Sequence, residues 1–185
     1  MRHEGERHVA LIRGINVGRA KRVAMADLRT AIAALGYRDV VTLLNSGNVV
    51  FSAAAGEAGA AGARIERAMA RRLGVSARVT VLNAADIAEA IAENPLGAIA
   101  HDPARLLVTI PRTAGDRAAL IPLTRQDWTP DVLALGRRVA YLWCAGGILD
   151  SRLLSAVTKT SGDAATSRNW STMVKLHALT QTPPR

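Results

Sequence analysis

The first side chains that could do chemistry lie between residues 13 and 22, where cationic and amide groups surround two glycines (RGINVGRAKR). Glycine allows a backbone to approach a ligand closely and to adopt positive φ, and the N–H groups at the start of a following helix attract negative charge. These properties predict an anion-binding loop whose contacts are Arg13, Asn16 and Lys21. The spacing matches neither a P-loop nor a dinucleotide-binding G-x-G-x-x-G, and an exposed loop of solvated arginines is the alternative.

A second group of polar side chains lies on the tight turn of residues 44–49 (LNSGNV). The amides of Asn45 and Asn48 and the hydroxyl of Ser46 could hydrogen-bond a polar ligand, and all three are predicted contacts. Turn formation is the alternative, because Asn and Gly tolerate left-handed backbone geometry and cap local backbone groups. Ser46 is not favoured as a nucleophile, since activation needs an adjacent base and the histidines lie in no recognisable catalytic motif: His3, His8, His101 and His177.

A third group lies at residues 166–171 (TSRNWS), at the start of the last predicted helix. Arg168 would project near the positive end of that helix, Ser167 or Asn169 could cap it, and Trp170 offers a flat apolar face. Arg168, Asn169 and Trp170 are predicted contacts of a nucleotide-like ligand. A capped, docked terminal helix with Trp170 in the core is the alternative.

The sequence contains no pattern that predicts a metal site, another cofactor or a catalytic pair of acids. Cys144 is the single cysteine, so neither an intramolecular disulfide nor a cysteine-cluster metal site can form. No two histidines are three or four residues apart, and the carboxylates are scattered. Whether the chain is an enzyme therefore stays open.

Hydrophobic periodicity and turn residues predict the elements that position these groups. Between residues 8 and 82 the pattern predicts, in order, a strand at 8–13, a helix at 25–35, a hairpin of 39–44 and 48–52, a helix at 57–73 and a strand at 76–82. This β-α-β-β-α-β order is that of a ferredoxin-like α/β plait.

A second cycle of the same order follows a linking helix at 85–93. It comprises a strand at 105–110, a weak helix at 114–120, a hairpin of 131–135 and 138–144, a helix at 150–159, a short strand at 164–166 and a terminal helix at 169–179. The predicted fold is therefore α+β, with two ferredoxin-like α/β-plait subdomains at 1–82 and 83–185. The second subdomain carries an additional C-terminal helix.

Composition indicates a globular chain with a strong positive charge. Hydrophobic residues make up 49% of its 185 residues, although only six are aromatic. The formal net charge is +9, from 21 Arg and 3 Lys against 15 acidic residues. Genomic bias can exchange Lys for Arg but cannot create a net excess of positive charge. This excess indicates phosphate-bearing partners, or it serves colloidal stability alone.

The predicted location is cytoplasmic. Residues 1–8 are polar, carry both charge signs and lead into no long apolar stretch, unlike a secretory signal. No segment approaches the roughly 20 apolar residues of a membrane-spanning helix, and a single cysteine favours a reducing compartment. No membrane partner is therefore expected.

The stretch 9–51, together with SRL at 151–153 and TSRNWSTMVKL at 166–176, resembles the bacterial domain of unknown function 1697 family. The resemblance covers residues 9–179 and implies two α/β plaits. This sequence departs from the family pattern at two positions. Arg19 stands where the family has Gly, and Arg152 stands where the family has Lys. The family carries no established activity. Its motif residues fall on all three polar loops: Arg13, Gly14, Asn16, Gly18, Lys21, Met25, Ser46, Gly47, Asn48, Arg168, Asn169 and Trp170.

These observations together predict a protein that binds a small anionic or nucleotide-like ligand between its subdomains, through the three loops. One alternative is nucleic-acid binding, motivated by the charge, although base stacking needs aromatics on the sheet face and the first half offers only Tyr37 and Phe51. Another is an enzyme that acts on a phosphorylated substrate. The oligomeric state is not predicted.

Overall fold

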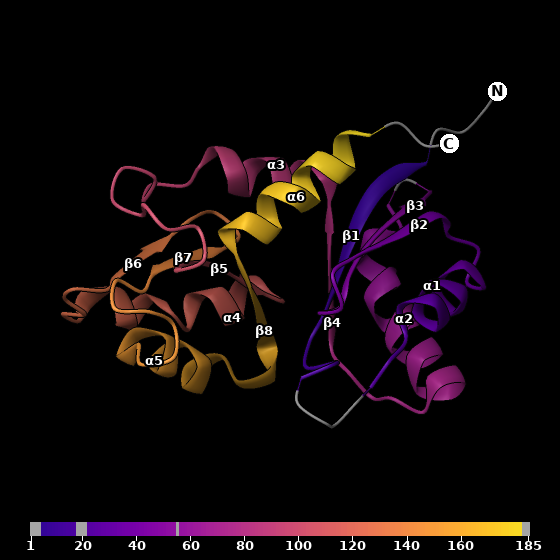
Figure 1. Ribbon diagram of the computed structural model, residues 1–185, viewed down its shortest axis with the longest axis horizontal. Helices are drawn as coiled ribbons and strands as arrows, with labels where there is room; N and C mark the ends of the chain where they lie inside the picture. The colour runs from indigo at the N-terminus through magenta and orange to yellow at the C-terminus, as the bar shows by residue number, and fades with distance from the viewer. Residues whose placement is uncertain (1–4, 18–21, 55, 183–185) are drawn as a thin grey trace. The chain divides into compact units, whose positions relative to one another are not determined.

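The computed structural model describes residues 5–17, 22–54 and 56–182 (Figure 1). The chain forms two compact units. One comprises residues 1–87 and 176–185, and the other comprises residues 88–175. The chain passes from one unit to the other within α3 (Ala84–Ala92) and again within α6 (Trp170–Gln181).

The first unit is a ferredoxin-like plait. Its elements are β1 (Glu6–Ile12), α1 (Met25–Ala33), β2 (Arg38–Leu43), β3 (Asn48–Ala53), α2 (Ala58–Leu73) and β4 (Val79–Asn83). The strands form an antiparallel sheet in the order β2-β3-β1-β4. Because β1 and β2 both run antiparallel to β3, their C-terminal ends lie at the same edge of the sheet.

Apolar side chains that alternate along the strands build the core of this unit. Ala10, Ile12, Val49 and Phe51 share one sheet face and cluster with apolar residues of α1 and α2. The two helices lie side by side (Figure 1). On α1 and α2 the packed residues recur at helical spacing: Leu28, Ile32, Ile65 and Met69.

The second unit repeats this architecture. Its elements are β5 (Leu106–Pro111), α4 (Ala114–Ala118), β6 (Val132–Leu135), β7 (Ala140–Trp143), α5 (Arg152–Ser161) and β8 (Ala165–Asn169). The sheet order β6-β7-β5-β8 is that of the first unit, with each strand replaced by its counterpart. The predicted two-plait fold and the additional C-terminal helix α6 are thereby confirmed.

Element boundaries differ from those predicted mainly at weak segments. The helix predicted at 114–120 ends at Ala118, because a 3-10 turn follows at Ile121–Arg125 with Pro at its start. The strand predicted at 164–166 extends to Asn169, since β8 pairs with β5 from Leu107 to Pro111. The length of β8 was not apparent from its sequence, because ATSRN is polar.

A buried tyrosine of the second unit predicts a pH dependence of stability. The Tyr141 side chain is fully buried and its hydroxyl donates a hydrogen bond to Ala90 O at 2.8 Å. Burial raises the pKa of Tyr141 to about 12, whereas an unfolded tyrosine titrates near a pKa of about 10. The folded pKa is the higher one, so this stabilisation is complete below pH ~10 and is lost as the pH rises toward 12.

The measurement is urea unfolding across this range. We expect the wild-type free energy of unfolding to fall with pH, and Tyr141→Phe to fall less steeply because it keeps the ring and lacks the ionisable group. Burial also raises the pKa of Tyr37. Ionisation of Tyr37 therefore accounts for part of the pH dependence that remains in Tyr141→Phe. Identical slopes in wild type and Tyr141→Phe would contradict this assignment.

Candidate functional site

The loop after β1 is closed by the side chain of Asn16. Its Nδ2 donates hydrogen bonds to Val23 O at 2.9 Å and to Asn45 O at 2.8 Å, and its Oδ1 accepts one from Val23 N at 2.8 Å. Asn16 adopts a left-handed φ of 56°. The Arg13 backbone N–H donates to Arg78 O. Lys21, the third predicted contact of this loop, lies outside the described residues.

The β2–β3 turn lies directly against this loop. Asn48 Nδ2 donates hydrogen bonds to Leu43 O at 3.1 Å and to Ser46 Oγ at 3.0 Å, and Gly47 O accepts one from Ile12 N at 2.7 Å. The structure therefore brings the first two predicted loops together within one unit. Their amides hold the loop and the turn in shape, which is the turn-forming role that the sequence also allows.

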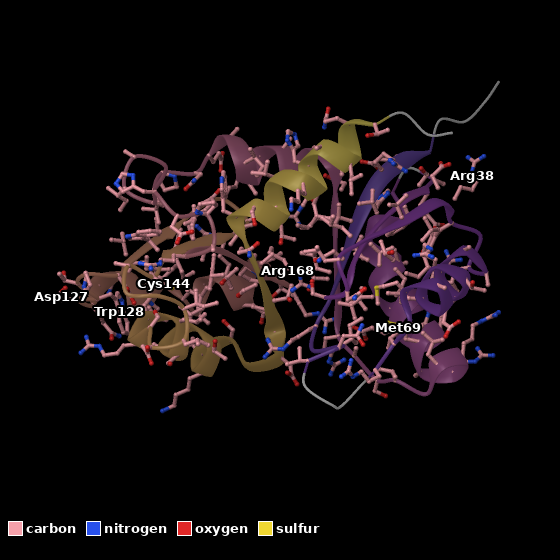
Figure 2. The ribbon with its side chains drawn as sticks, viewed as in Figure 1. Arg38, Met69, Asp127, Trp128, Cys144 and Arg168 are labelled. Atoms are coloured by element: carbon pink, nitrogen blue, oxygen red, sulfur yellow. The ribbon has the colours of Figure 1, made fainter. Side chains whose placement is uncertain are left out.

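The third predicted group belongs to the second unit. Arg168 lies on β8 (Figure 2), and its Nη1 donates hydrogen bonds to Thr166 Oγ1 and Ser167 O, both at 2.8 Å. Burial lowers the pKa of Arg168 to about 10, so the guanidinium stays charged at neutral pH.

Asn169 and Trp170 form the start of α6. Asn169 Oδ1 accepts hydrogen bonds from Thr172 N at 3.0 Å and Ser171 Oγ at 3.1 Å, which caps the helix. Trp170 is half-buried as the first helical residue. Of the predicted contacts, Arg13, Asn16, Asn45, Ser46 and Asn48 thus lie in the first unit, and the three residues from Arg168 to Trp170 lie in the second. That they bind a ligand stays a prediction.

The structure reveals a cationic pocket that the sequence analysis missed. It has a volume of about 460 Å³ and lies at the end of α1 and along α2 of the first unit. We name it the α2 arginine pocket. Among its described lining residues none is acidic: Leu35, Arg64, Arg67, Ala68, Arg71 and Arg72.

Arg64 is anchored at one side of the α2 arginine pocket. Its Nη1 lies 2.7 Å from Glu57 Oε2, and its Nη2 donates a hydrogen bond to Leu35 O at 2.9 Å. The guanidinium also lies over the Tyr37 ring, 5.1 Å from the centroid. These contacts fix the position of one charge, which lowers the entropy lost when an anion binds beside it.

The other three arginines of this pocket are exposed. In the part of the chain that the structure describes, no hydrogen bond or ion pair engages the guanidinium groups of Arg67, Arg71 and Arg72. Arg67 and Arg71 stand four residues apart on one helix face, where like charges repel by a few tenths of a kcal/mol, on the order of 0.2–0.5. The signal was in the sequence, because the arginines at 64, 67 and 71 recur at helical spacing within the predicted helix.

Another pocket, of about 320 Å³, lies in the second unit and is lined in part by Trp128; Figure 2 labels this residue. Ser151 Oγ donates to Asp131 Oδ2 at 2.6 Å and accepts from Leu154 N at 3.0 Å, which caps α5. Burial raises the pKa of the neighbouring Cys144 thiol, so that it is protonated and unreactive at neutral pH. Arg152 lines the rim. This arrangement is explained by capping of the helix.

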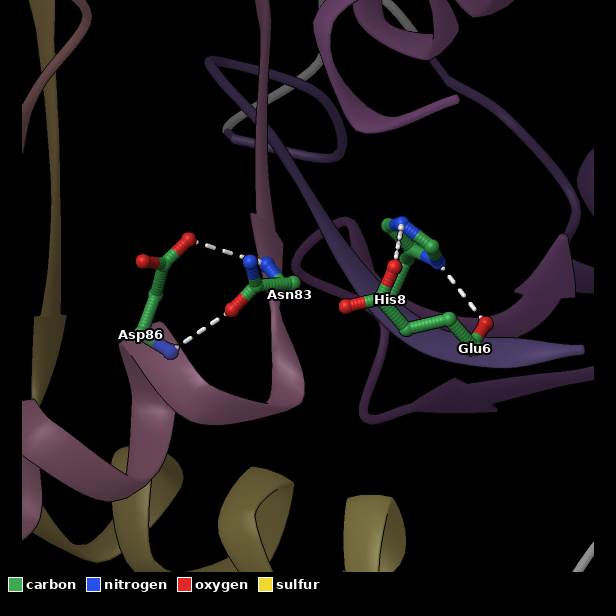
Figure 3. A network of polar contacts seen from close by, with 4 residues as sticks. All are labelled: Glu6, His8, Asn83 and Asp86. Atoms are coloured by element: carbon green, nitrogen blue, oxygen red, sulfur yellow. Dashed lines mark hydrogen bonds and ion pairs between the residues drawn. The ribbon is translucent and has the colours of Figure 1, made fainter. Parts of the chain in front are cut away.

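His8 is the most enclosed titratable group of the first sheet (Figure 3). Its Nδ1 lies 2.8 Å from Glu6 O, its Nε2 lies 3.7 Å from Glu6 Oε2, and its ring stacks on Phe51 at 5.5 Å. Asn83 and Asp86 exchange two hydrogen bonds that cap α3. The Asn83–Asp86 pair is explained by capping of α3, and His8 is closed off from solvent.

In the described ranges 5–17, 22–54 and 56–182, no group of three or more His, Cys, Asp or Glu side chains could hold a metal ion. Among those same residues, no helix has the length and apolar character needed to cross a bilayer.

Comparisons with known proteins identify the family. A solved structure titled as the conserved bacterial protein SP0830 from Streptococcus pneumoniae is similar with a TM-score of 0.76 and 24% sequence identity, over 96% of this chain and 99% of that one. At that identity the likeness concerns the fold alone. No curated protein matches the sequence significantly. The family described as "Protein of unknown function (DUF1697)" matches residues 6–141. The chain therefore belongs to the DUF1697 family.

Proposed function

We propose that this protein binds a small ligand carrying two or more anionic groups, with phosphates as the best fit, in the α2 arginine pocket. One observation carries the proposal. Arg67, Arg71 and Arg72 point exposed guanidinium groups at one pocket without an acidic side chain among its described lining residues.

The size of the pocket and the spacing of its charges describe the ligand. Arg64 and Arg71 are seven positions apart, which is about 10 Å along a helix axis. Arginine binds phosphate or carboxylate through two parallel hydrogen bonds, so this length accommodates at least two such groups. The volume of about 460 Å³ lies within the range of roughly 300–1,000 Å³ that small-molecule sites occupy.

The pocket recognises charge and offers little to an aromatic base. Its apolar lining is limited to Leu35 and Ala68. Tyr37 is 5% exposed and lies beneath Arg64, where it cannot stack on a ligand. The phosphate groups of a ligand would therefore contribute most of the affinity, and different polyphosphates should bind alike.

Helix electrostatics explain only part of this cluster. Arg71 and Arg72 lie in the last turn of α2, where cations interact favourably with the helix dipole. Arg67 lies before that turn, and its repulsion with Arg71 works against helix stability. A bound anion would remove this repulsion.

The test is calorimetric titration of tripolyphosphate and inorganic pyrophosphate into the wild type and Arg67→Gln/Arg71→Gln. The matched control, Arg125→Gln/Lys159→Gln, removes two exposed charges outside the pocket. A hydrogen bond to a charged group contributes about 1.5–3 kcal/mol, so the pocket variant should bind at least about tenfold more weakly while the control changes little.

Equal loss in both variants would mean that only net charge matters, and absence of binding to the wild type would end the proposal. An oligonucleotide that binds more tightly than tripolyphosphate, with a steep dependence on salt, would favour a nucleic-acid partner instead. The predicted contacts of Arg13 and Arg168 are tested separately, by Arg13→Ala and Arg168→Ala in the same titration.

A further inference from the structure

The second plait contains its own cationic site at the edge of its sheet. As in the first plait, the two parallel strands of the β-α-β unit end at one edge, here β5 at Pro111 and β6 at Leu135. The connection from β5 to α4 and the β6–β7 turn therefore meet. The same position in the first plait holds the Asn16 loop and the Asn45 turn, which Asn16 joins.

A hydrogen bond ties these two segments of the second plait together. Arg117 Nε, on α4, donates to Gly136 O in the β6–β7 turn at 2.7 Å, and Gly136 N donates to Val139 O at 2.8 Å, which closes the turn. The turn also lies against a buried ring, because a Cβ built on Gly136 would be 2.8 Å from Tyr141 Cε2. The segment is therefore held in place before any ligand arrives.

These segments enclose a pocket of about 210 Å³. Four arginines from three segments line it, and among its described lining residues none is acidic: Pro111, Arg112, Thr113, Ala114, Arg117, Arg137 and Arg138. Arg137 is paired with a carboxylate, and a second carboxylate beside the pocket belongs to the capping box of α4. Glu89 Oε1 is 2.8 Å from Arg137 Nη1, and Asp116 Oδ2 accepts hydrogen bonds from Thr113 N and Oγ1.

We infer that this second pocket, the β5–β6 arginine pocket, binds one phosphate group, either as free phosphate or as a phosphate monoester. Its volume is less than half that of the α2 arginine pocket, which suits a single tetrahedral anion. Guanidinium groups from separate segments can surround such an anion and bind several of its oxygens. The site lies in the other unit from the α2 arginine pocket and does not depend on it.

The experiment is a titration of ¹⁵N-labelled full-length protein followed by NMR, with inorganic phosphate and phenyl phosphate in separate arms. We expect saturable shifts of the amides at 112–117 and 136–138 and of the Arg117 Nε–H signal. Phosphate that binds at least as tightly as phenyl phosphate would identify the free ion as the ligand, and the reverse order would identify a monoester. Both results support the site.

Variants separate this site from the first. Arg112→Gln/Arg138→Gln should weaken phosphate binding at these signals by about tenfold or more, whereas Arg67→Gln/Arg71→Gln should leave it unchanged. Arg125→Gln/Lys159→Gln again serves as the charge-matched control. The inference is overturned by wild-type spectra in which these signals do not respond to either anion, or by equal loss in the control.

Discussion

Gly47→Ala is expected to lower the free energy of unfolding by about 2 to 5 kcal/mol, from left-handed strain and overpacking together. Gly47 has a φ of 78°, and a Cβ built there would lie 2.8 Å from Ile12 O and 2.9 Å from Ile12 Cβ. The strand cannot retreat, because Ile12 N donates its hydrogen bond to Gly47 O at 2.7 Å. Chemical denaturation followed by circular dichroism measures the loss.

Gly14→Ala is the matched control for this prediction. Gly14 has a similar φ of 70°, yet nothing lies within 4 Å of the Cβ that alanine would add. It should show only the left-handed penalty of about 1–2 kcal/mol. If the two alanine variants were equally stable, the close contact between residue 47 and Ile12 would not contribute to the loss of stability. The overpacking argued for this turn would then be wrong.

Asn16→Ala should destabilise the first plait by about 2–4 kcal/mol, as a result of three lost hydrogen bonds and a left-handed alanine. The side chain bonds to Val23 N, Val23 O and Asn45 O, at 2.8, 2.9 and 2.8 Å. Because Asn16 is only half-buried, water can replace part of what is lost. Thermal and urea unfolding provide the measurement.

Two further substitutions at Asn16 separate backbone strain from hydrogen bonding. Asn16→Gly loses the same three bonds but accepts the φ of 56° without strain, so it should be less destabilising than Asn16→Ala. Asn16→Asp keeps the acceptor for Val23 N and loses the two hydrogen bonds that Asn16 Nδ2 donates. A fully stable Asn16→Ala that has lost anion binding would reverse the assignment and make Asn16 a ligand contact.

Much of this fold was predictable because its elements are locally encoded. The helix from Ala58 to Leu73 shows its buried face at helical spacing and ends at Gly74, whose φ of 66° a glycine adopts without strain. The β2–β3 hairpin is marked by its Asn-Ser-Gly turn. The extent of β8 was not predictable, since its polar residues are set by pairing with β5.

The candidate sites were predictable only in part. That the Asn16 loop meets the Asn45 turn follows from the plait, where two parallel strands end at one edge. The α2 arginine pocket depends instead on which arginines find a carboxylate. Arg64 finds Glu57 and Arg67 does not, and no spacing rule distinguishes them because both lie on the same helical stripe.

The division of the chain within α3 and α6 has a consequence for how the protein is made. The first unit includes residues 176–185 as well as 1–87, and Arg7 Nη2 donates a hydrogen bond to Leu179 O at 3.3 Å. A ribosome therefore completes the second unit before it has synthesised the last segment of the first. The first plait therefore lacks its contacts with α6 until residues 176–182 have been synthesised.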